Sequence, residues 1–373
     1  MILTKQSQHI MKICLAISTL SSGGAERNAC LLGNYLSKEN SVSILTFQKN
    51  KDCFYSISKE IKILNLNLLN NNQNFLSKIY NFLKRIYSIN LNLRTRKPDV
   101  LISFLETMNI TVLISSLFIK SIKIKIISDR NNPEKSERPI LNLILKTIFY
   151  RFCSYLVLQT KGITKMYKFL NKSKIKIIQN TITEDIKCRN IKIFNKKLKF
   201  ISVGRLEKQK GYDVLIEALY LLKKKNINFQ CDIYGVGSQQ KIIKEMIDRY
   251  ELNNFIFLKG VSNNILHLYH KYDLYILSSR FEGFPNSLLE ALAARVVSVS
   301  SNCNFGPTEI ISNNRTGIIF KNNNPKDLFE KLYRIISNKK KYLYISKNLE
   351  KKFNLKKYNT EKFEKWKKLI QID

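Results

Sequence analysis

The chain reads RFEGFPNSLLE over residues 280–290 and GPTEII over residues 306–311. Two carboxylates, Glu282 and Glu290, bracket a Gly-Phe-Pro turn, and apolar residues at helical spacing follow that turn. Pro285 suits a first helical turn because its φ is preset and it has no N–H to leave unpaired. A helix start presents unpaired N–H groups and the positive end of the helix dipole. The pattern therefore predicts a phosphate site at this turn.

The two carboxylates are better suited to hydroxyl groups than to phosphate. Glu290 lies one turn beyond Asn286 on the predicted helix, close to its anion-binding end, where it would repel a phosphate. Ionised carboxylates act only as hydrogen-bond acceptors. We therefore expect Glu290 to bind hydroxyls such as those of a ribose, and Glu282 to bind those of a sugar.

Length and patterning indicate two domains of ordinary size. The chain has 373 residues, of which 44% are hydrophobic, and this exceeds what one core usually holds. Short apolar runs alternate with helical patterns, as in parallel sheets covered by helices on both faces. Strands are expected in the first half at residues 12–17, 42–47, 99–104, 124–128, 155–159 and 175–179. In the second half they are expected at residues 200–203, 229–234, 255–258, 274–277, 296–300 and 317–320.

This alternation predicts an α/β protein with two doubly wound, Rossmann-like domains. The expected boundaries are residues 1–182 for the first domain, 183–197 for a polar linker, 198–350 for the second domain and 351–373 for a C-terminal helix. Ligands of such folds bind at the carboxyl ends of the strands, so we expect a cleft between two facing domains. The tail is expected to pack back on the first domain through Tyr358, Phe363, Trp366 and Leu369.

A basic loop follows the strand expected at residues 200–203. It reads GRLEKQKG over residues 204–211 and places Arg205 and Lys210 before a helix. Arginine offers a planar fork and lysine a compact charge, a pair that can neutralise a diphosphate without a metal. The chain has no Asp-x-Asp motif and no evident carboxylate cluster for magnesium. A basic surface loop without a ligand is the alternative interpretation.

Three further glycine turns follow expected strands, at Gly23-Gly24, Gly235-Val236-Gly237 and Gly260-Val261-Ser262. The first would let backbone approach a phosphate closely, and the other two would shape a pocket for a nucleobase. The first and the third are equally compatible with an ordinary turn between a strand and a helix.

The net charge is +36, from 64 Lys and Arg against 28 Asp and Glu. It suggests an anionic partner such as nucleic acid, anionic lipid or phosphate, although lysines spread along the whole chain also fit a compositional bias. Seven cysteines without a C-x-x-C pair indicate reduced thiols and a cytoplasmic location. The polar residues 1–9 do not match a secretory leader. His267 and His270 lack the neighbours of a metal site, so no metal and no cofactor is expected.

Taken in order, these motifs resemble the retaining GT-B glycosyltransferases of family 4. The resemblance rests on residues 23–27, 204–211, 235–237, 282–290 and 306–311, and so spans nearly the whole chain. Residues 128–133, which read SDRNNP, together with residues 282–286, look closest to bacterial enzymes that add N-acetylgalactosamine or related hexoses to polyprenyl-diphosphate-linked glycans.

The resemblance implies transfer of a hexose or N-acetylhexosamine from a nucleotide sugar, favouring UDP, to a lipid-linked or surface-polysaccharide glycan. The implied catalytic residues are Glu282, Arg205 and Lys210, with the two cations holding the diphosphate and Glu282 contacting the donor sugar. Glu290 would bind the ribose. The other implied donor-binding residues are Gly24, Gly283, Phe284, Asn286, Ser287 and Leu288.

The chain departs from the family pattern at three places. Many relatives carry a histidine near the acceptor, where this chain has Asp129 and Arg130, and Arg130 is the candidate replacement. Asp129 is a less favoured candidate for assisting the acceptor hydroxyl, because attack on the same face of the sugar needs no strong base. Arg295 stands where relatives usually have glycine, and Val297 where proline is usual.

Membrane association is a separate prediction. Residues 75–87 mix apolar, aromatic and basic side chains at helical spacing, which is typical of a helix lying on a membrane surface, although a core helix fits equally. Residues 140–151 are expected to form a buried helix. A first domain resting on anionic lipid at the inner face of the cytoplasmic membrane would bring the site to a lipid-linked acceptor.

A basic nucleic-acid-binding protein without enzymatic activity is the alternative function. The charge fits it. The chain lacks helix-turn-helix spacing, zinc-finger ligands and an aromatic strand motif for single strands, so nucleic acid is not the expected partner.

Overall fold

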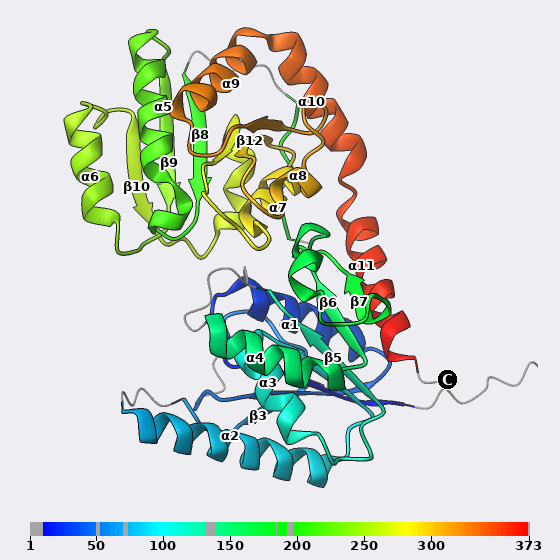
Figure 1. Ribbon diagram of the computed structural model, residues 1–373. Coiled ribbons are helices and arrows are strands. Elements are labelled where there is room, and N and C mark those ends of the chain that lie inside the picture. The colour runs from blue at the N-terminus through cyan, green and yellow to red at the C-terminus, as the bar shows by residue number, and fades with distance from the viewer. Residues whose placement is uncertain are drawn as a thin grey trace, which may run out of the picture. The chain divides into compact units, whose positions relative to one another are not determined.

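The computed structural model describes residues 10–49, 53–69, 74–130, 139–183, 185–191 and 197–371. The chain divides into two compact units (Figure 1). The first unit comprises Met1–Gln159, Ile163–Thr181 and Glu361–Asp373, and the second comprises Thr160–Gly162 and Ile182–Thr360. Residues 1–9 and part of the predicted linker, residues 184 and 192–196, lie outside the described residues.

The described residues of the first unit form a seven-stranded sheet in the order β3-β2-β1-β4-β5-β6-β7, with every neighbouring pair parallel. Its strands are β1 (Lys12–Ala16), β2 (Ser41–Thr46), β3 (Lys62–Asn65), β4 (Val100–Phe104), β5 (Ile124–Ser128), β6 (Tyr155–Leu158) and β7 (Ile175–Ile177). The central strand β4 is buried along its whole length. Such a strand is apolar on both faces because helices cover both sides of the sheet.

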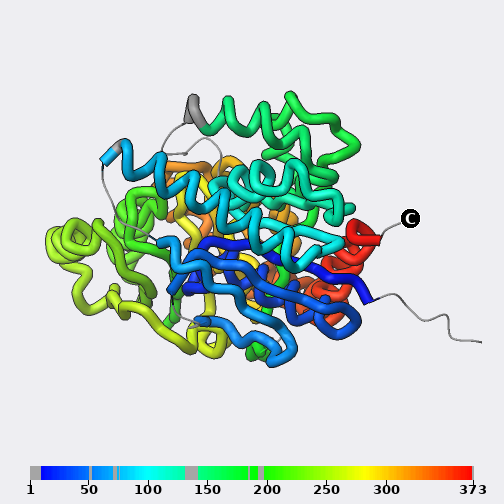
Figure 2. The backbone as a smooth tube through the Cα atoms, turned by 90° about the horizontal axis from the view of Figure 1, so that it is seen from below, coloured from blue at the N-terminus to red at the C-terminus, as the bar shows by residue number. Residues whose placement is uncertain are grey.

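Helices cover the two faces of this sheet separately. Ile13 and Leu15 of β1 share a core with α1 (Gly24–Leu36). Cys14 and Ala16, which alternate with them, face a second core that contains residues of α2 (Phe75–Arg96) and α3 (Glu106–Ser115). The helix α4 (Pro139–Phe149) packs next to α3, and Figures 1 and 2 show α2, α3 and α4 as one layer of this unit.

The described residues of the second unit form a six-stranded parallel sheet in the order β10-β9-β8-β11-β12-β13. Its strands are β8 (Leu198–Val203), β9 (Phe229–Tyr234), β10 (Ile256–Gly260), β11 (Leu274–Leu277), β12 (Val297–Ser301) and β13 (Ile318–Phe320). Its helices are α5 (Tyr212–Lys224), α6 (Gln240–Arg249), α7 (Asn286–Ala293), α8 (Pro307–Ile310), α9 (Pro325–Ser337) and α10 (Lys339–Lys352). Two doubly wound α/β units are thus confirmed.

The last helix, α11 (Leu355–Ile370), belongs to both units. Trp366 and Ile370 are buried in the core of the first unit, and the ring of Phe363 stacks on Tyr35 at 4.4 Å. The predicted return of the tail to the first domain is therefore confirmed. Tyr358 is an exception to that prediction, because it packs against the core of the second unit, next to Phe353.

Two elements differ from the sequence-based expectations. The strand β3 was not predicted, because its four residues KILN are too few for a clear alternation. The helix α4 was expected to be buried, and this is wrong: Leu143, Ile144 and Ile148 are about half exposed, whereas Lys146 is buried. The buried lysine has acidic partners from other elements, which a periodicity argument does not detect.

Candidate active site

The candidate site lies at one edge of the six-stranded sheet. The strands are parallel, so their carboxyl ends meet at the same edge. The loop at residues 204–211 follows β8, the loop at residues 235–239 follows β9, and the turn at residues 278–285 follows β11. The predicted donor-binding motifs of the second domain therefore gather at this edge.

Hydrogen bonds to backbone carbonyls tie the loop at residues 204–211 to the turn after β11. Arg280 N donates to the Gln209 carbonyl at 2.8 Å, and Ser278 Oγ donates to the Lys210 carbonyl at 2.9 Å. Gln209 Nε2 donates to the Phe281 carbonyl at 2.9 Å. These contacts fix Lys210 relative to the residues around Glu282.

Two glycines make this close approach possible. Gly211 has φ +62°, and a Cβ there would lie 2.3 Å from the Ser278 carbonyl oxygen. Gly235 has φ +143°, and a Cβ there would lie 2.0 Å from the Gly204 carbonyl oxygen. Any other residue at either position would push two loops of the site apart.

Lys210 and Glu282 form an ion pair in the site. Lys210 Nζ lies 2.6 Å from Glu282 Oε1, and Ser279 Oγ donates to the same oxygen at 2.7 Å. The carboxylate is only 5% exposed. Since one oxygen receives both of these bonds, Glu282 is held as a partly neutralised acceptor beside a cation.

Arg205 is the exposed cation of the site, and it forms no ion pair with a described residue. Its neighbour Glu207 accepts hydrogen bonds from Ser238 N at 2.9 Å and from Ser238 Oγ at 2.7 Å. These bonds, together with the charge of Arg205, lower the pKa of Glu207. The loop that carries Arg205 is therefore anchored to the loop after β9, while the guanidinium remains accessible.

The helix α7 begins at Asn286, one residue after Pro285. Ser287 Oγ lies 2.8 Å from the hydroxyl of Tyr275. The Gly306 residue has φ +98°, and a Cβ there would lie 2.4 Å from Pro285 Cδ, so the GPTEII segment packs directly on the start of α7. The predicted helix start is confirmed within one residue.

Glu290 lies on the first turns of α7 and is 6% exposed. The hydroxyl of Tyr269 donates to Glu290 Oε2 at 2.9 Å. Tyr269 belongs to a short 3-10 helix, Tyr269–Lys271, and its side chain is fully buried. It therefore holds the carboxylate in one orientation.

Six of the predicted residues of the second domain fall into two groups. Arg205, Lys210, Glu282 and Glu290 place charged side chains at the edge of the sheet. Phe284 and Leu288 are buried in the core, so they can reach a ligand only through their backbone. Gly24 lies in the other unit, where it opens α1. All of these roles stay predictions.

The supporting residues Ser279, Tyr269, Tyr275 and Gln209 were not predicted. Each acts through a side-chain hydrogen bond to a residue of the site. Hydroxyl and amide side chains are common throughout the chain, so neither their type nor their spacing distinguished these four.

Residues 184–352 match the family model described as glycosyl transferases group 1. The chain is a glycosyltransferase. The match covers most of the second unit, which carries the loops described above.

Curated relatives of this glycosyltransferase extend the likeness beyond that domain. It is 28% identical over 83% of its length to a GalNAc-alpha-(1->4)-GalNAc-alpha-(1->3)-diNAcBac-PP-undecaprenol alpha-1,4-N-acetyl-D-galactosaminyltransferase of Campylobacter jejuni, of which the match covers 84%. It is 25% identical over 94% of its length to an uncharacterized glycosyltransferase of Haemophilus influenzae, of which 97% is covered.

Solved structures show the same fold. The lipopolysaccharide outer core galactosyltransferase WaaB matches 96% of this glycosyltransferase and 99% of its own chain, with a TM-score of 0.76 and 18% identity. Anabaena HepE, solved with UDP and glucose, matches 96% of this chain and all of its own, with a TM-score of 0.74 and 15% identity. The predicted GT-B fold class is confirmed.

In the first unit of the glycosyltransferase, Asp129 lies in a buried polar cluster. It accepts hydrogen bonds from Asn109 Nδ2 and the Tyr150 hydroxyl, both at 2.8 Å, and from the Tyr167 hydroxyl at 2.5 Å. Lys146 Nζ lies 3.1 Å from Asp129 Oδ2, the oxygen that also accepts from Tyr167. With four donors and 4% exposure, this carboxylate acts as a structural acceptor, which weakens the less favoured interpretation of Asp129 as a base.

Arg130, the candidate replacement for the acceptor-side histidine, is also buried. It bonds Asn180 Oδ1 through Nη1 and Ser128 Oγ through Nε, and its guanidinium lies over the ring of Phe104. Burial lowers its pKa to about 9. The following residues of the SDRNNP motif, 131–133, lie outside the described residues.

Within the described part of the chain, no group of three or more His, Cys, Asp or Glu is arranged to hold a metal ion. His267 Nε2 instead lies 3.1 Å from Asp185. Among the helices that the structure describes, none is both long enough and apolar enough to cross a bilayer.

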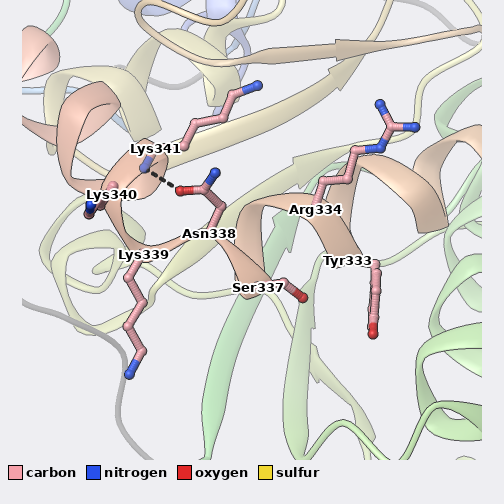
Figure 3. Close-up of a pocket in the computed structure, with 7 residues that line it drawn as sticks. All are labelled: Tyr333, Arg334, Ser337, Asn338, Lys339, Lys340 and Lys341. Carbon is pink, nitrogen blue, oxygen red and sulfur yellow. Dashed lines mark hydrogen bonds between the residues drawn. The ribbon is translucent and has the colours of Figure 1, made fainter.

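An open hollow of about 530 Å³ lies between α9 and α10, lined by Tyr333, Arg334, Ser337, Asn338 and Lys339–Lys341 (Figure 3). Its basic side chains border the start of α10. The side chain of Asn338 accepts from Lys341 N at 2.9 Å, so the chain itself caps this helix start. We assign the hollow no role in the reaction.

Proposed function

We propose that this glycosyltransferase moves a hexose or N-acetylhexosamine from a nucleotide sugar to a lipid-linked or surface-polysaccharide glycan, with retention at the anomeric carbon. The observation that carries the proposal is the convergence of two cations, two carboxylates and the start of α7 at one sheet edge. This set matches the parts of a nucleotide sugar: cations for the diphosphate, and carboxylates for the hydroxyls of the ribose and of the sugar.

Arg205 and Lys210 bind the diphosphate in this proposal. When the bond from the anomeric carbon to the diphosphate oxygen breaks, negative charge develops on the leaving group. A preformed cationic site stabilises that charge without reorganisation. The bond from the acceptor hydroxyl oxygen forms on the same face of the sugar, and the hydroxyl proton passes to the departing diphosphate oxygen, so no side-chain nucleophile is required.

Lys210 has a second property that suits it to this role. Its ion pair with Glu282 keeps the ammonium in place before the donor arrives, because both groups are largely removed from solvent. Arg205 supplies an exposed guanidinium that forms no ion pair with a described residue. Together they neutralise a diphosphate without a divalent ion, and we propose that the reaction needs no metal and no cofactor.

UDP is the proposed nucleotide, and a polyprenyl-diphosphate-linked glycan is the proposed acceptor. Anabaena HepE was solved with UDP and glucose. The name of the Campylobacter jejuni relative specifies an undecaprenol-linked glycan as its acceptor. The fold likeness and the 28% identity support these two assignments at the level of chemical class.

A membrane-linked acceptor implies a membrane location for the enzyme. We propose that the protein is cytoplasmic and attaches peripherally to the anionic inner face of the cytoplasmic membrane. The excess of 64 Lys and Arg over 28 Asp and Glu supports this attachment. Nucleic acid is not a proposed partner.

A screen of UDP-sugars and GDP-sugars tests the proposed function. Donor hydrolysis or transfer is measured in the presence of EDTA, and proton NMR of the product reports the configuration at the anomeric carbon. We expect turnover with a UDP-sugar, an α-linked product from an α-linked donor, and loss of at least tenfold in Arg205→Ala and Glu290→Ala.

The matched control is Arg334→Ala, which removes a highly exposed arginine of the same unit. It is expected to keep wild-type turnover. An inverted product, or turnover that requires manganese, would contradict the proposed mechanism.

A further inference from the structure

The first unit exposes an unusual number of large apolar side chains on one helix. Along α2 the exposed ones are Leu76, Ile79, Tyr80, Leu83, Tyr87 and Leu91. At 100° per residue these six positions fall within an arc of about 120°. Leu76 is 78% exposed and Tyr87 is 70% exposed, so the arc faces solvent and not the core.

The opposite side of α2 holds the helix on the sheet. Ile89 and Leu93 are buried in the core beneath it, together with residues of α3. Arg85 donates to the Leu68 carbonyl and lies over the ring of Phe47. The exposed stripe is therefore a second apolar side, in addition to the one that folding uses.

The neighbouring helix α4 is oriented with its lysine inward and apolar residues outward. Lys146 is 6% exposed and lies 2.9 Å from Glu106 and 3.1 Å from Asp129. The coulombic pull of these carboxylates outweighs the burial that opposes it and raises the pKa of Lys146. Leu143, Ile144 and Ile148 point to solvent as a result.

The exposure of the apolar side chains of α4 follows from these buried ion pairs. Burying two acids and a lysine is costly unless they pair well, and the pairs here fix the rotation of α4 about its axis. Phe152, directly after α4, is also about half exposed. We call the exposed sides of α2 and α4 the α2–α4 face.

The charges on this face all have one sign. Neither α2 nor α4 contains an aspartate or a glutamate. Lys84 and Arg94 of α2 are exposed, with Lys84 beside the stripe and Arg94 at its end, whereas the exposed Lys78 and Arg96 lie about 160° from the centre of the stripe. An apolar stripe with a cation beside it and another at its end complements a surface that offers both acyl chains and anionic headgroups.

We propose that the α2–α4 face docks on an anionic lipid bilayer. A helix of 22 residues is about 33 Å long, so α2 can lie flat in the headgroup region. Its two tyrosines, which are apolar with a polar tip, suit that region. Figures 1 and 2 show α2, α3 and α4 in one layer of the first unit, so the two helices can meet one surface.

The inference rests on the proposed function in one respect: a lipid-linked acceptor would give the enzyme a reason to dock on a bilayer. It does not depend on that function for its test. Docking is measured with lipids alone, whereas the function is measured with a nucleotide sugar.

Vesicle flotation tests the inference. The full-length protein is mixed with phosphatidylcholine vesicles, with or without phosphatidylglycerol, at low and at high salt. We expect flotation only with phosphatidylglycerol, decreasing as salt is raised. The double variant Leu83→Glu/Tyr87→Glu is expected to lose at least tenfold in binding, and Ile144→Glu/Ile148→Glu to lose several-fold.

The control is Tyr344→Glu, an exposed tyrosine of α10 in the second unit, which is expected to bind vesicles like the wild type. Thermal unfolding without ligand, followed by circular dichroism, checks that each variant is folded. Flotation unchanged in Leu83→Glu/Tyr87→Glu, or equal with and without phosphatidylglycerol, overturns the inference. Failure of the wild type to float while it glycosylates a soluble acceptor also overturns it, and leaves the proposed function intact.

Discussion

Arg295 adopts a backbone conformation that favours glycine. It follows α7 with φ +61°, in the left-handed region. The resemblance to family 4 had marked this position as one where relatives usually have glycine, and the positive φ gives the physical reason. The side chain compensates in part, because Arg295 Nη1 lies 2.7 Å from Glu350 Oε1.

We predict that Arg295→Gly is more stable than Arg295→Ala by about 1 kcal/mol, since only the alanine variant has a Cβ in the left-handed region. Both variants lose the ion pair with Glu350, so that contribution cancels in the comparison. Urea unfolding of the two variants measures the difference. Equal midpoints, or a more stable alanine variant, would show that the backbone at this position is relaxed.

Tyr269 positions Glu290 through a buried hydrogen bond. A bond from a hydroxyl to a carboxylate contributes about 1.5–3 kcal/mol, which corresponds to roughly tenfold or more in binding. We therefore predict that Tyr269→Phe raises the KM for the nucleotide sugar at least about tenfold, with a smaller change in kcat. Steady-state kinetics with varied donor would show this.

The control for Tyr269→Phe is Tyr342→Phe, which removes another buried hydroxyl of the same unit, one that donates to the Asp273 carbonyl. It is expected to keep the wild-type KM. If both variants raise the KM equally, the effect comes from general loosening of the unit and not from Glu290.

At the scale of elements, the site depends on how tightly the loop at residues 204–211 is held to the turn after β11. Arg280 joins the two, because Nη1 donates to the Lys208 carbonyl at 2.8 Å while both of its terminal nitrogens bond Asp213 on α5. Burial works against ionisation of Asp213, but the hydrogen bonds and charge of Arg280 outweigh it and lower the pKa of Asp213 from its ordinary value.

A group with a depressed folded pKa stabilises the protein above its unfolded pKa, and this contribution is lost as the pH falls through the folded pKa. We predict that Asp213→Asn is less stable than the wild type by about 0.5–1 kcal/mol near neutral pH, since the pair is partly exposed. The difference should shrink below about pH 4. Thermal unfolding at neutral and at acidic pH tests this, and a difference that grows on acidification would exclude the ion pair as its cause.

The elements that sequence could predict are those specified by local patterns. The fully buried strand VLISF of β4 and the segment GFPNS, which leads into α7, each carry their signal within a few residues. The orientation of α4 cannot be predicted from a local pattern, because the partners of Lys146 come from the start of α3 and from the residue after β5. The same holds for the Lys210 and Glu282 pair, whose members are 72 residues apart.

At the scale of the whole molecule, the tail joins the fold of the first unit. Trp366, the one tryptophan of the chain, is 3% exposed and lies 6.1 Å from the ring of Phe104 on β4. Its burial places the last helix in the core of a unit that begins more than 300 residues earlier in the chain.

We predict that Trp366→Ala destabilises the first unit by about 3–5 kcal/mol, the usual cost of deleting a buried aromatic side chain. UDP binding is expected to persist, since the proposed nucleotide contacts lie in the second unit. Proteolysis followed by mass spectrometry would locate the loss of protection. Cleavage confined to the second unit would contradict this assignment of the tail.

The central claim is that the cations at the edge of the six-stranded sheet bind the diphosphate of a nucleotide sugar. Calorimetric titration of UDP into the protein in the presence of EDTA measures this most directly, with Arg205→Ala and Lys210→Ala compared against Arg334→Ala. The account predicts that the wild type and Arg334→Ala bind UDP without metal, and that each of the other two variants loses at least tenfold in affinity. Equal affinity in all four proteins, or binding that appears only when manganese is added, would contradict it.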